Sequence, residues 1–314
     1  MSILTYSSQI PDSVRRGSSL TIGNFDGVHK GHHSLIQLVR ERAAEQGLCS
    51  MAVTFHPHPM RVLKGKTPPF LTPTKQKLDL LKERGLDFVL CLEFTRELAS
   101  LSPEDFVYQY LVQILSCKWL IVGHDYTFGR GGAGDYSLLM QLGEKYGFHT
   151  EQIEAVTING DVVSSTRIRE LIQEGRVEEA APLLGRCYRI AGKVIEGSRR
   201  GGPVLNIPTA NLEPVDELIP ASGVYAVWAD HAGIRYPAVA NVGHNPTFNQ
   251  KTLSVEVHIL DFSQDIYGDQ LRVSFVRRLR GERRFSGIED LKDQIGRDIE
   301  EGRRVLGEAG SGCN

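Results

Sequence analysis

The chain contains no long hydrophobic run. None of its apolar runs approaches the roughly 20 residues that a membrane-spanning helix needs. Its first residues, MSILTYSSQIPDSVRRGS, also lack the apolar core of a signal peptide. We therefore expect a cytoplasmic protein without a membrane partner.

Cysteine and excess charge are scarce as well. The five cysteines show no paired spacing of a metal site, and four lie in or beside apolar runs, which suits reduced thiols. The 36 basic and 38 acidic residues give a net charge of −2, so the whole chain does not attract nucleic acid. Arginines between 277 and 284 could form an RNA-binding stripe, but the acidic residues beside them favour a solvated surface. We expect no nucleic-acid partner.

The first half of the chain alternates apolar runs with amphipathic stretches, a pattern typical of a parallel α/β sheet covered on both faces. The runs are Leu20–Gly23, Cys49–Phe55, Phe88–Leu92, Trp119–Val122 and Phe148–Ile153. The predicted helices are 31–46, 73–84, 103–115 and 135–146. Ligands of such sheets bind beyond the carboxyl ends of the strands.

Two predicted helix starts are basic, although acidic residues are normally favoured there. One follows the glycine turn after Leu20–Gly23 and carries His29 and His32, and the other follows Ser164 and carries Arg167 and Arg169. A helix start with glycines beside it suits a phosphate, so the two starts together predict a split polyphosphate site. Zinc binding by the histidines, and plain helix capping by the serines, are the alternatives.

After Gly185 the pattern changes to short strands separated by turns, which predicts an antiparallel barrel. The predicted strands are Tyr188–Glu196, Gly223–Ala229, Tyr236–Val242, Thr252–Leu260 and Leu271–Phe275, followed by a helix over 287–306. We expect domains at 1–185 and 186–306 and a flexible tail at 307–314.

A set of motifs spanning nearly the whole chain resembles the bacterial bifunctional riboflavin kinase/FMN adenylyltransferase family. The motifs are GNFDGVHKGH, PHP, VGHDYTFG, SSTRIRELI, PTANL, GVYAV, ANVG-x-x-PTF, VEVHILDF and IYGD. The resemblance implies a Rossmann-like nucleotidyltransferase domain that makes FAD and pyrophosphate from FMN and ATP. It also implies a six-stranded barrel that makes FMN and ADP from riboflavin and ATP, with Mg²⁺ in both reactions.

The resemblance assigns roles in the first domain. It implies that His29 and His32 are catalytic. It implies ATP or phosphate binding by Gly23, Asn24, Phe25, Asp26, Gly31, Ser165, Thr166 and Arg169. It implies flavin binding by His58, Pro59, Asp125 and Phe128. Asp125 could equally shape its loop.

In the second domain the resemblance implies that Glu256 is the catalytic base, that Thr209 and Asn211 hold Mg²⁺ and ATP, and that Gly202 contacts ATP. From the residues alone, Glu256 could be a solvated strand residue, and Thr209 and Asn211 could be turn residues.

The chain departs from the family pattern at Pro203, Asn206, Asn245 and Gly132. An adenylyltransferase with an impaired kinase, or a non-catalytic flavin- or nucleotide-binding regulator, are therefore alternative functions. We expect riboflavin, FMN and ATP as small-molecule partners, and a monomer or weak homo-oligomer.

Overall fold

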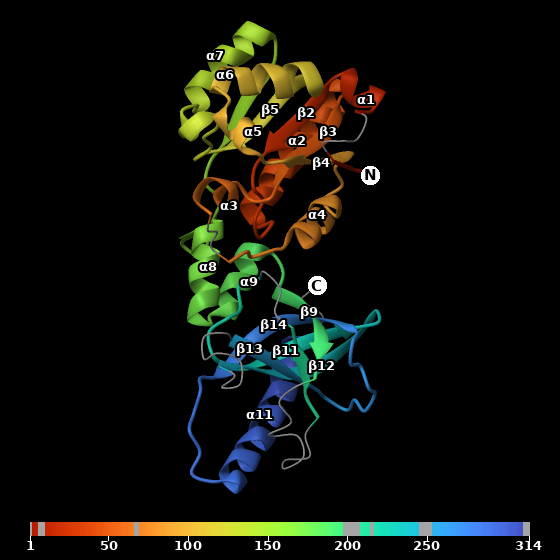
Figure 1. The fold of residues 1–314 in the computed structure, drawn as a ribbon, viewed down its shortest axis with the longest axis vertical. Helices are drawn as coiled ribbons and strands as arrows, with labels where there is room; N and C mark the ends of the chain where they lie inside the picture. Colours follow the sequence, from red (N-terminus) through yellow and green to blue (C-terminus); the bar gives the residue numbers. More distant parts are fainter. Residues whose placement is uncertain are drawn as a thin grey trace. The chain divides into compact units, whose positions relative to one another are not determined.

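The computed structural model describes residues 2–5, 10–65, 69–196, 208–213, 217–244 and 253–309. It divides into two compact units, Met1–Val163 and Ser164–Asn314. Figure 1 shows the elements of both units.

The first unit is built on a six-stranded parallel sheet, which confirms the predicted fold class. Its strand order is β1-β4-β3-β2-β5-β6. The strands are β1 (Ser2–Thr5), β2 (Ser18–Ile22), β3 (Cys49–His56), β4 (Phe88–Glu93), β5 (Cys117–Gly123) and β6 (His149–Ile153). The apolar runs predicted β2 to β6, whereas β1 was not predicted.

Helices cover both faces of this sheet because alternate strand residues point to opposite sides. On one face, α2 (Lys30–Gln46) and α4 (Thr74–Lys82) pack in a core with Ala52, Val89 and Ile121. On the other face, Met51, Leu90 and Leu120 lie in a core with the remaining sheet-covering helices. These are α1 (Asp12–Arg15), α5 (Arg96–Ser100), α6 (Pro103–Phe106), the π-helix η1 (Val107–Ile114) and α7 (Tyr136–Tyr146).

Three smaller features complete the first unit. They are α3 (Pro59–Lys64), the 3-10 helix η2 (Arg130–Gly132), and the antiparallel pair β7 (Thr157–Ile158) and β8 (Asp161–Val162).

The second unit contains a closed barrel of six antiparallel strands in the order β10-β13-β12-β11-β14-β9. Its strands are β9 (Tyr188–Ile195), β10 (Ala210–Leu212), β11 (Gly223–His231), β12 (Ile234–His244), β13 (Leu253–Ile259) and β14 (Gln270–Arg280). The predicted barrel and terminal helix are confirmed, although the short β10 was not predicted as a strand.

Helix α11 (Ile288–Ala309) packs against the barrel (Figure 1). The buried carboxylate of Asp298 accepts hydrogen bonds from Arg280 at the end of β14, the shortest being 2.8 Å. Because α11 extends to Ala309, the first three residues of the predicted tail are helical, and residues 310–314 lie outside the described residues.

Helices α8 (Ser165–Glu174) and α9 (Val177–Leu184) belong to the unit that contains the barrel. Arg278 on β14 donates a hydrogen bond to the Glu174 carbonyl, and Ala221 donates to the Ile172 carbonyl.

One expectation about the cysteines is wrong: Cys187 is disulfide-bonded, whereas Cys49, Cys91 and Cys117 are free thiols.

Candidate active sites

The topology of the first unit marks one edge of the sheet. From β2 the chain adds β3 and β4 on one side, and later adds β5 and β6 on the other side. In parallel sheets, ligands bind outside the carboxyl ends of the strands where the order reverses in this way. The loops that leave β2 and β5 at this edge hold residues 23–29 and 124–135, which include half of the ligand-binding residues predicted for the first domain.

His29 and His32 form a reciprocal cap at the start of α2. The Nδ1 atom of His29 accepts a hydrogen bond from the His32 N–H at 3.4 Å, and Nδ1 of His32 accepts from the His29 N–H at 3.3 Å. Their rings stack with centroids 3.6 Å apart and an interplanar angle of 14°. The pair thus stands where the helix dipole favours an anion.

Gly31 lies between these histidines, and the stacking explains why no side chain is present. A Cβ atom at Gly31 would lie 3.2 Å from both Nδ1 and Cε1 of His29. That contact is tighter than ordinary van der Waals distance, so a side chain would press on the imidazole. The glycine therefore keeps the ring of His29 in place.

The loop before the histidines has an unusual backbone conformation. Phe25 and Val28 have φ values of 49° and 40°, although neither is glycine, and both side chains are fully buried. A β-branched residue rarely adopts this conformation, and each such residue costs about 1–3 kcal/mol. The Phe25 ring meets the His32 ring edge-on at 5.0 Å, so the strained loop directly supports a predicted catalytic residue.

The carboxylate of Asp26 attaches this loop to a neighbouring segment. It is buried and accepts hydrogen bonds from the N–H groups of Leu71 and Thr72 at 3.0–3.1 Å. The Thr72 hydroxyl donates to Asp26 at 3.3 Å and accepts from the Gly27 N–H at 3.0 Å. These contacts show Asp26 organising the protein around the site.

A buried lysine, which sequence reasoning missed, reaches the same loop from α4. The Lys77 ammonium donates to the backbone carbonyls of Asn24 and Phe55, at 3.1 and 3.2 Å. The Asn24 carbonyl lies just after the end of β2, and the Phe55 carbonyl lies near the end of the adjacent strand β3. A sequence signal did exist, because Lys77 precedes the buried Leu80 and Leu81 by three and four residues and so shares their helix face.

The predicted flavin-binding residues differ in exposure. His58 caps α3, whose first residue is Pro59, by accepting from the Met60 N–H at 3.2 Å. Asp125 is exposed after β5, whereas the ring of Phe128 is buried against Phe106. Asp125 is thus accessible to a ligand, and the Phe128 ring packs inside the protein.

The second basic helix start is α8, in the other unit. Ser164 caps it by accepting from the Arg167 N–H at 3.1 Å, and Arg167 also pairs with Glu170 at 3.4 Å. Ser165 and Arg169 are half-buried and Thr166 is exposed. The prediction that α2 and α8 grip one polyphosphate joins residues of both units and stays a prediction.

In the barrel, three polar residues form a row across adjacent strands. Asn211 on β10 is the register partner of Glu256 on β13, and Glu256 is in turn the partner of Asn241 on β12. Directly opposed residues of antiparallel strands project on the same face, so the three side chains are neighbours. Burial raises the pKa of Glu256. Asn241 was missed, although it lies in the ANVG motif.

His258 extends this polar face towards the predicted Mg²⁺ ligands. It lies two residues after Glu256 on β13, and its Nδ1–H donates to the Pro208 carbonyl at 2.8 Å. Thr209 follows Pro208 and is half-buried. Gly202, and the departures Pro203, Asn206 and Asn245, lie outside the described residues.

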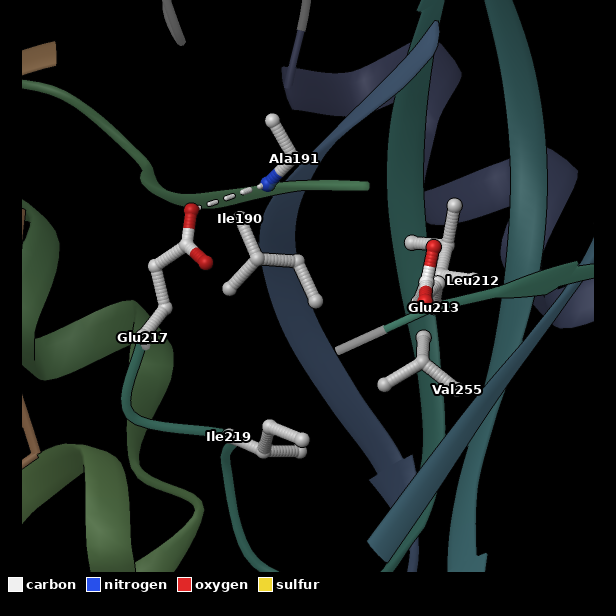
Figure 2. A pocket seen from close by; sticks show the side chains of 7 residues that line it. All are labelled: Ile190, Ala191, Leu212, Glu213, Glu217, Ile219 and Val255. Atoms are coloured by element: carbon white, nitrogen blue, oxygen red, sulfur yellow. Dashed lines mark hydrogen bonds between the residues drawn. The ribbon is translucent and has the colours of Figure 1, made fainter. Parts of the chain in front are cut away.

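A small pocket opens elsewhere on the barrel (Figure 2). Glu217 directs its carboxylate to the Ala191 N–H at 3.2 Å. Leu212 and Val255 line the pocket, and each directly adjoins a residue of the polar row, so they project from the opposite strand face. The pocket is therefore separate from the row. Its lining residues are Ile190, Ala191, Leu212, Glu213, Glu217, Ile219 and Val255.

Comparison with known proteins identifies both units. The FAD synthetase family matches residues 12–167, and the riboflavin kinase family matches residues 184–306. The bifunctional riboflavin kinase/FMN adenylyltransferase of Escherichia coli (strain K12) is 38% identical over 302 residues, covering 96% of this chain and 95% of that protein. The chain belongs to this bifunctional family. It joins an FAD synthetase and a riboflavin kinase in one polypeptide.

Other members of the bifunctional family and a solved structure extend the likeness. The Bacillus subtilis (strain 168) enzyme is 36% identical over 310 residues, covering 96% of this chain and 97% of its own. A crystal structure of a protein from Streptococcus pneumoniae, described as a macrolide-efflux protein, matches with a TM-score of 0.83 and 32% identity. That match covers 91% of this chain and 94% of the other. In the part of this chain that the structure describes, no helix is long and apolar enough to cross a membrane.

Proposed function

We propose that the family's two reactions take place at separate sites, each centred on one unit. The first unit transfers an adenylyl group from ATP to FMN at the His29–His32 pair. The second unit phosphorylates riboflavin at the row that contains Glu256.

In adenylyl transfer, an oxygen of the FMN phosphate attacks the α-phosphorus of ATP, and pyrophosphate leaves. No protein nucleophile is needed, so alignment and stabilisation of charge dominate the catalysis. With both Nδ1 atoms accepting hydrogen bonds, the neutral imidazoles of His29 and His32 carry their protons on Nε2. Those N–H groups, together with the start of α2, suit the charge that develops on the phosphates.

In the kinase reaction the nucleophile is the ribityl hydroxyl of riboflavin, which attacks the γ-phosphorus of ATP. Glu256 removes the hydroxyl proton as the bond forms, and ADP leaves. Its raised pKa makes this carboxylate a stronger base than an exposed glutamate. Asn211, its register partner, lies close enough to orient the groups that meet there.

Mg²⁺ suits the donor set of the second unit. Asn211 offers an amide oxygen beside Glu256, and Thr209, two residues earlier in the chain, offers a hydroxyl. Mg²⁺ prefers a few protein oxygens combined with phosphate oxygens. Among the described residues, no group of three or more His, Cys, Asp or Glu side chains could form an all-protein metal site. Bound Mg²⁺ would neutralise charge on the transferred phosphoryl group.

The observation that carries the proposal is the arrangement of the kinase row, where a carboxylate of raised pKa is paired with an amide on the adjacent strand. Incubation with riboflavin, ATP and Mg²⁺, followed by chromatography, tests it. We expect FMN first and FAD afterwards. Riboflavin left untouched, together with FMN not converted to FAD, would overturn the proposal. Because both reactions draw on ATP, the proposal also places the enzyme in the cytoplasm.

A further inference from the structure

The loop that presents the histidines is held in its strained conformation from outside itself. Phe25 and Val28 have positive φ, and such a conformation persists only where the surrounding structure enforces it. Strand β3 holds the start of the loop, where Thr54 donates to the Asn24 carbonyl at 3.3 Å. The other described side-chain hydrogen bonds to residues 24–27 come from one segment, which runs from Leu71 through Thr72 to Lys77 near the start of α4. We call residues 71–77 the brace.

Lys77 is the unusual member of the brace. Its side chain is 5% exposed, and lysine is almost never buried unless its charge is compensated. Burial lowers the pKa of its ammonium group, while the nearby carboxylate of Asp26 acts in the opposite direction. The charge of Lys77 is compensated by hydrogen bonds that its ammonium group donates to the carbonyls of Asn24 and Phe55.

Those two carbonyls define the edge where the substrates are proposed to bind. Phe55 is near the end of β3, just before the His56–Pro59 segment, and Asn24 follows the end of β2. The ammonium group of Lys77 therefore fixes the carboxyl ends of the adjacent strands β2 and β3 relative to each other. Thr72 fixes the middle of the same loop through Asp26 and Gly27.

We propose that Lys77 and Thr72 are positioning residues for adenylyl transfer, which hold the strained loop so that His29 and His32 stand at the reacting phosphates. This inference rests on the proposed function of the first unit. Neither residue needs to touch a substrate. Their loss should therefore lower the rate of the chemical step more than the binding of FMN or ATP, because small displacements of aligned groups reduce rate strongly.

The test compares matched variants of the full chain. Lys77→Met removes the ammonium but retains an apolar stem, and Lys75→Met changes an exposed lysine of the same helix. Thr72→Val removes the hydroxyl at nearly constant volume, and Thr72→Ser restores it. We expect Lys77→Met and Thr72→Val to lower kcat of FAD formation by about 10- to 100-fold, with KM values within about threefold. Lys75→Met and Thr72→Ser should stay close to wild type.

Thermal unfolding of each variant shows whether the first unit has folded, kinase activity controls for the second unit, and long-range ¹H–¹⁵N spectra report directly on the imidazoles of His29 and His32. We expect those signals to shift in Lys77→Met and not in Lys75→Met. Unchanged kcat and unchanged imidazole signals in a folded Lys77→Met protein would overturn the inference, as would a loss confined to KM. If Lys77→Met fails to fold, the Thr72→Val and Thr72→Ser pair decides. A wild-type chain that makes no FAD would overturn the proposed function, while the spectra would still decide the inference.

Discussion

His29 and His32 each accept a hydrogen bond from the backbone N–H of the other, through Nδ1. The two rings are therefore fixed in the same tautomer while they cap their own helix. Because these hydrogen bonds also cap the start of α2, the helix fixes the orientation of both rings. Changes at this pair should affect one reaction of the enzyme and leave the other intact.

His32→Ala should abolish most FAD formation while FMN formation continues. Loss of one donor to a developing charge costs about 10²- to 10³-fold in rate. The measurement follows FMN to FAD and riboflavin to FMN separately in one preparation. Loss of both activities would contradict separate sites.

Gly31→Ala tests the stacking without removing an imidazole. The new methyl group would lie 3.2 Å from His29, so we expect FAD formation to fall while kinase activity is retained. Thermal unfolding shows whether the fold survives. Wild-type FAD formation in this variant would show that the ring of His29 can move without consequence.

Glu256→Gln should abolish FMN formation and leave conversion of FMN to FAD unchanged. In the wild-type protein, only the carboxylate form can take the proton, and burial raises the pKa of Glu256. The kinase rate should therefore fall on the acid side at a higher pH than the ordinary glutamate pKa of about 4.3. A pH profile of kcat measures this limb, and an acid limb at the ordinary value would count against Glu256 as the base.

The same substitution should stabilise the protein at neutral pH. Since the pKa of Glu256 is raised in the folded state, that state binds the proton more tightly than the unfolded chain does. The stabilisation that the protonated Glu256 side chain provides is complete below the pKa in the unfolded chain and is lost as pH rises through the pKa in the folded protein. Between these two pKa values, the free energy of unfolding of Glu256→Gln, measured with denaturant, should therefore rise relative to that of wild type as pH rises. A constant difference across that range would contradict the assignment.

Two glycines of α11 should respond oppositely to alanine. Gly296 has open space around its missing Cβ, so Gly296→Ala should add about 0.5–1 kcal/mol of stability. A Cβ at Gly302 would come within 2.7 Å of Cγ2 of Val239 on β12, so Gly302→Ala should cost about 1–3 kcal/mol. Denaturant unfolding measures both, and a stabilising Gly302→Ala would mean that α11 can shift on the barrel.

The sequence predicts those parts of the fold that repeat locally. Strands β2 to β6 follow from their apolar runs, and the end of α2 follows from Gly47, which has the left-handed conformation that ends helices. Strand β10 was missed because it is only three residues long and its Asn211 also fits a turn. Its pairing with β9 and β13 is a tertiary property that no local pattern encodes.

The candidate site likewise contains residues that a local motif predicts and contacts that only the folded chain brings together. His29, His32 and Glu256 lie in recognisable motifs, whereas the contact of Lys77 with Asn24 joins residues 53 positions apart. A lysine on a short amphipathic helix is normally solvated, so its burial depends on the particular carbonyls that meet it. Asp26 was predicted beside phosphate, and only the folded chain shows its carboxylate engaged with Leu71 and Thr72.

The barrel closes through β14, which lies between β11 and β9. During synthesis, strands β9 to β13 leave the ribosome before the strand that joins the two ends of their sheet. Until β14 arrives, β9 and β11 each present an unpaired edge, and open edges are templates for aggregation. In a chain that ends before residue 270, the barrel would therefore stay open, and its two unpaired strand edges could pair with other chains.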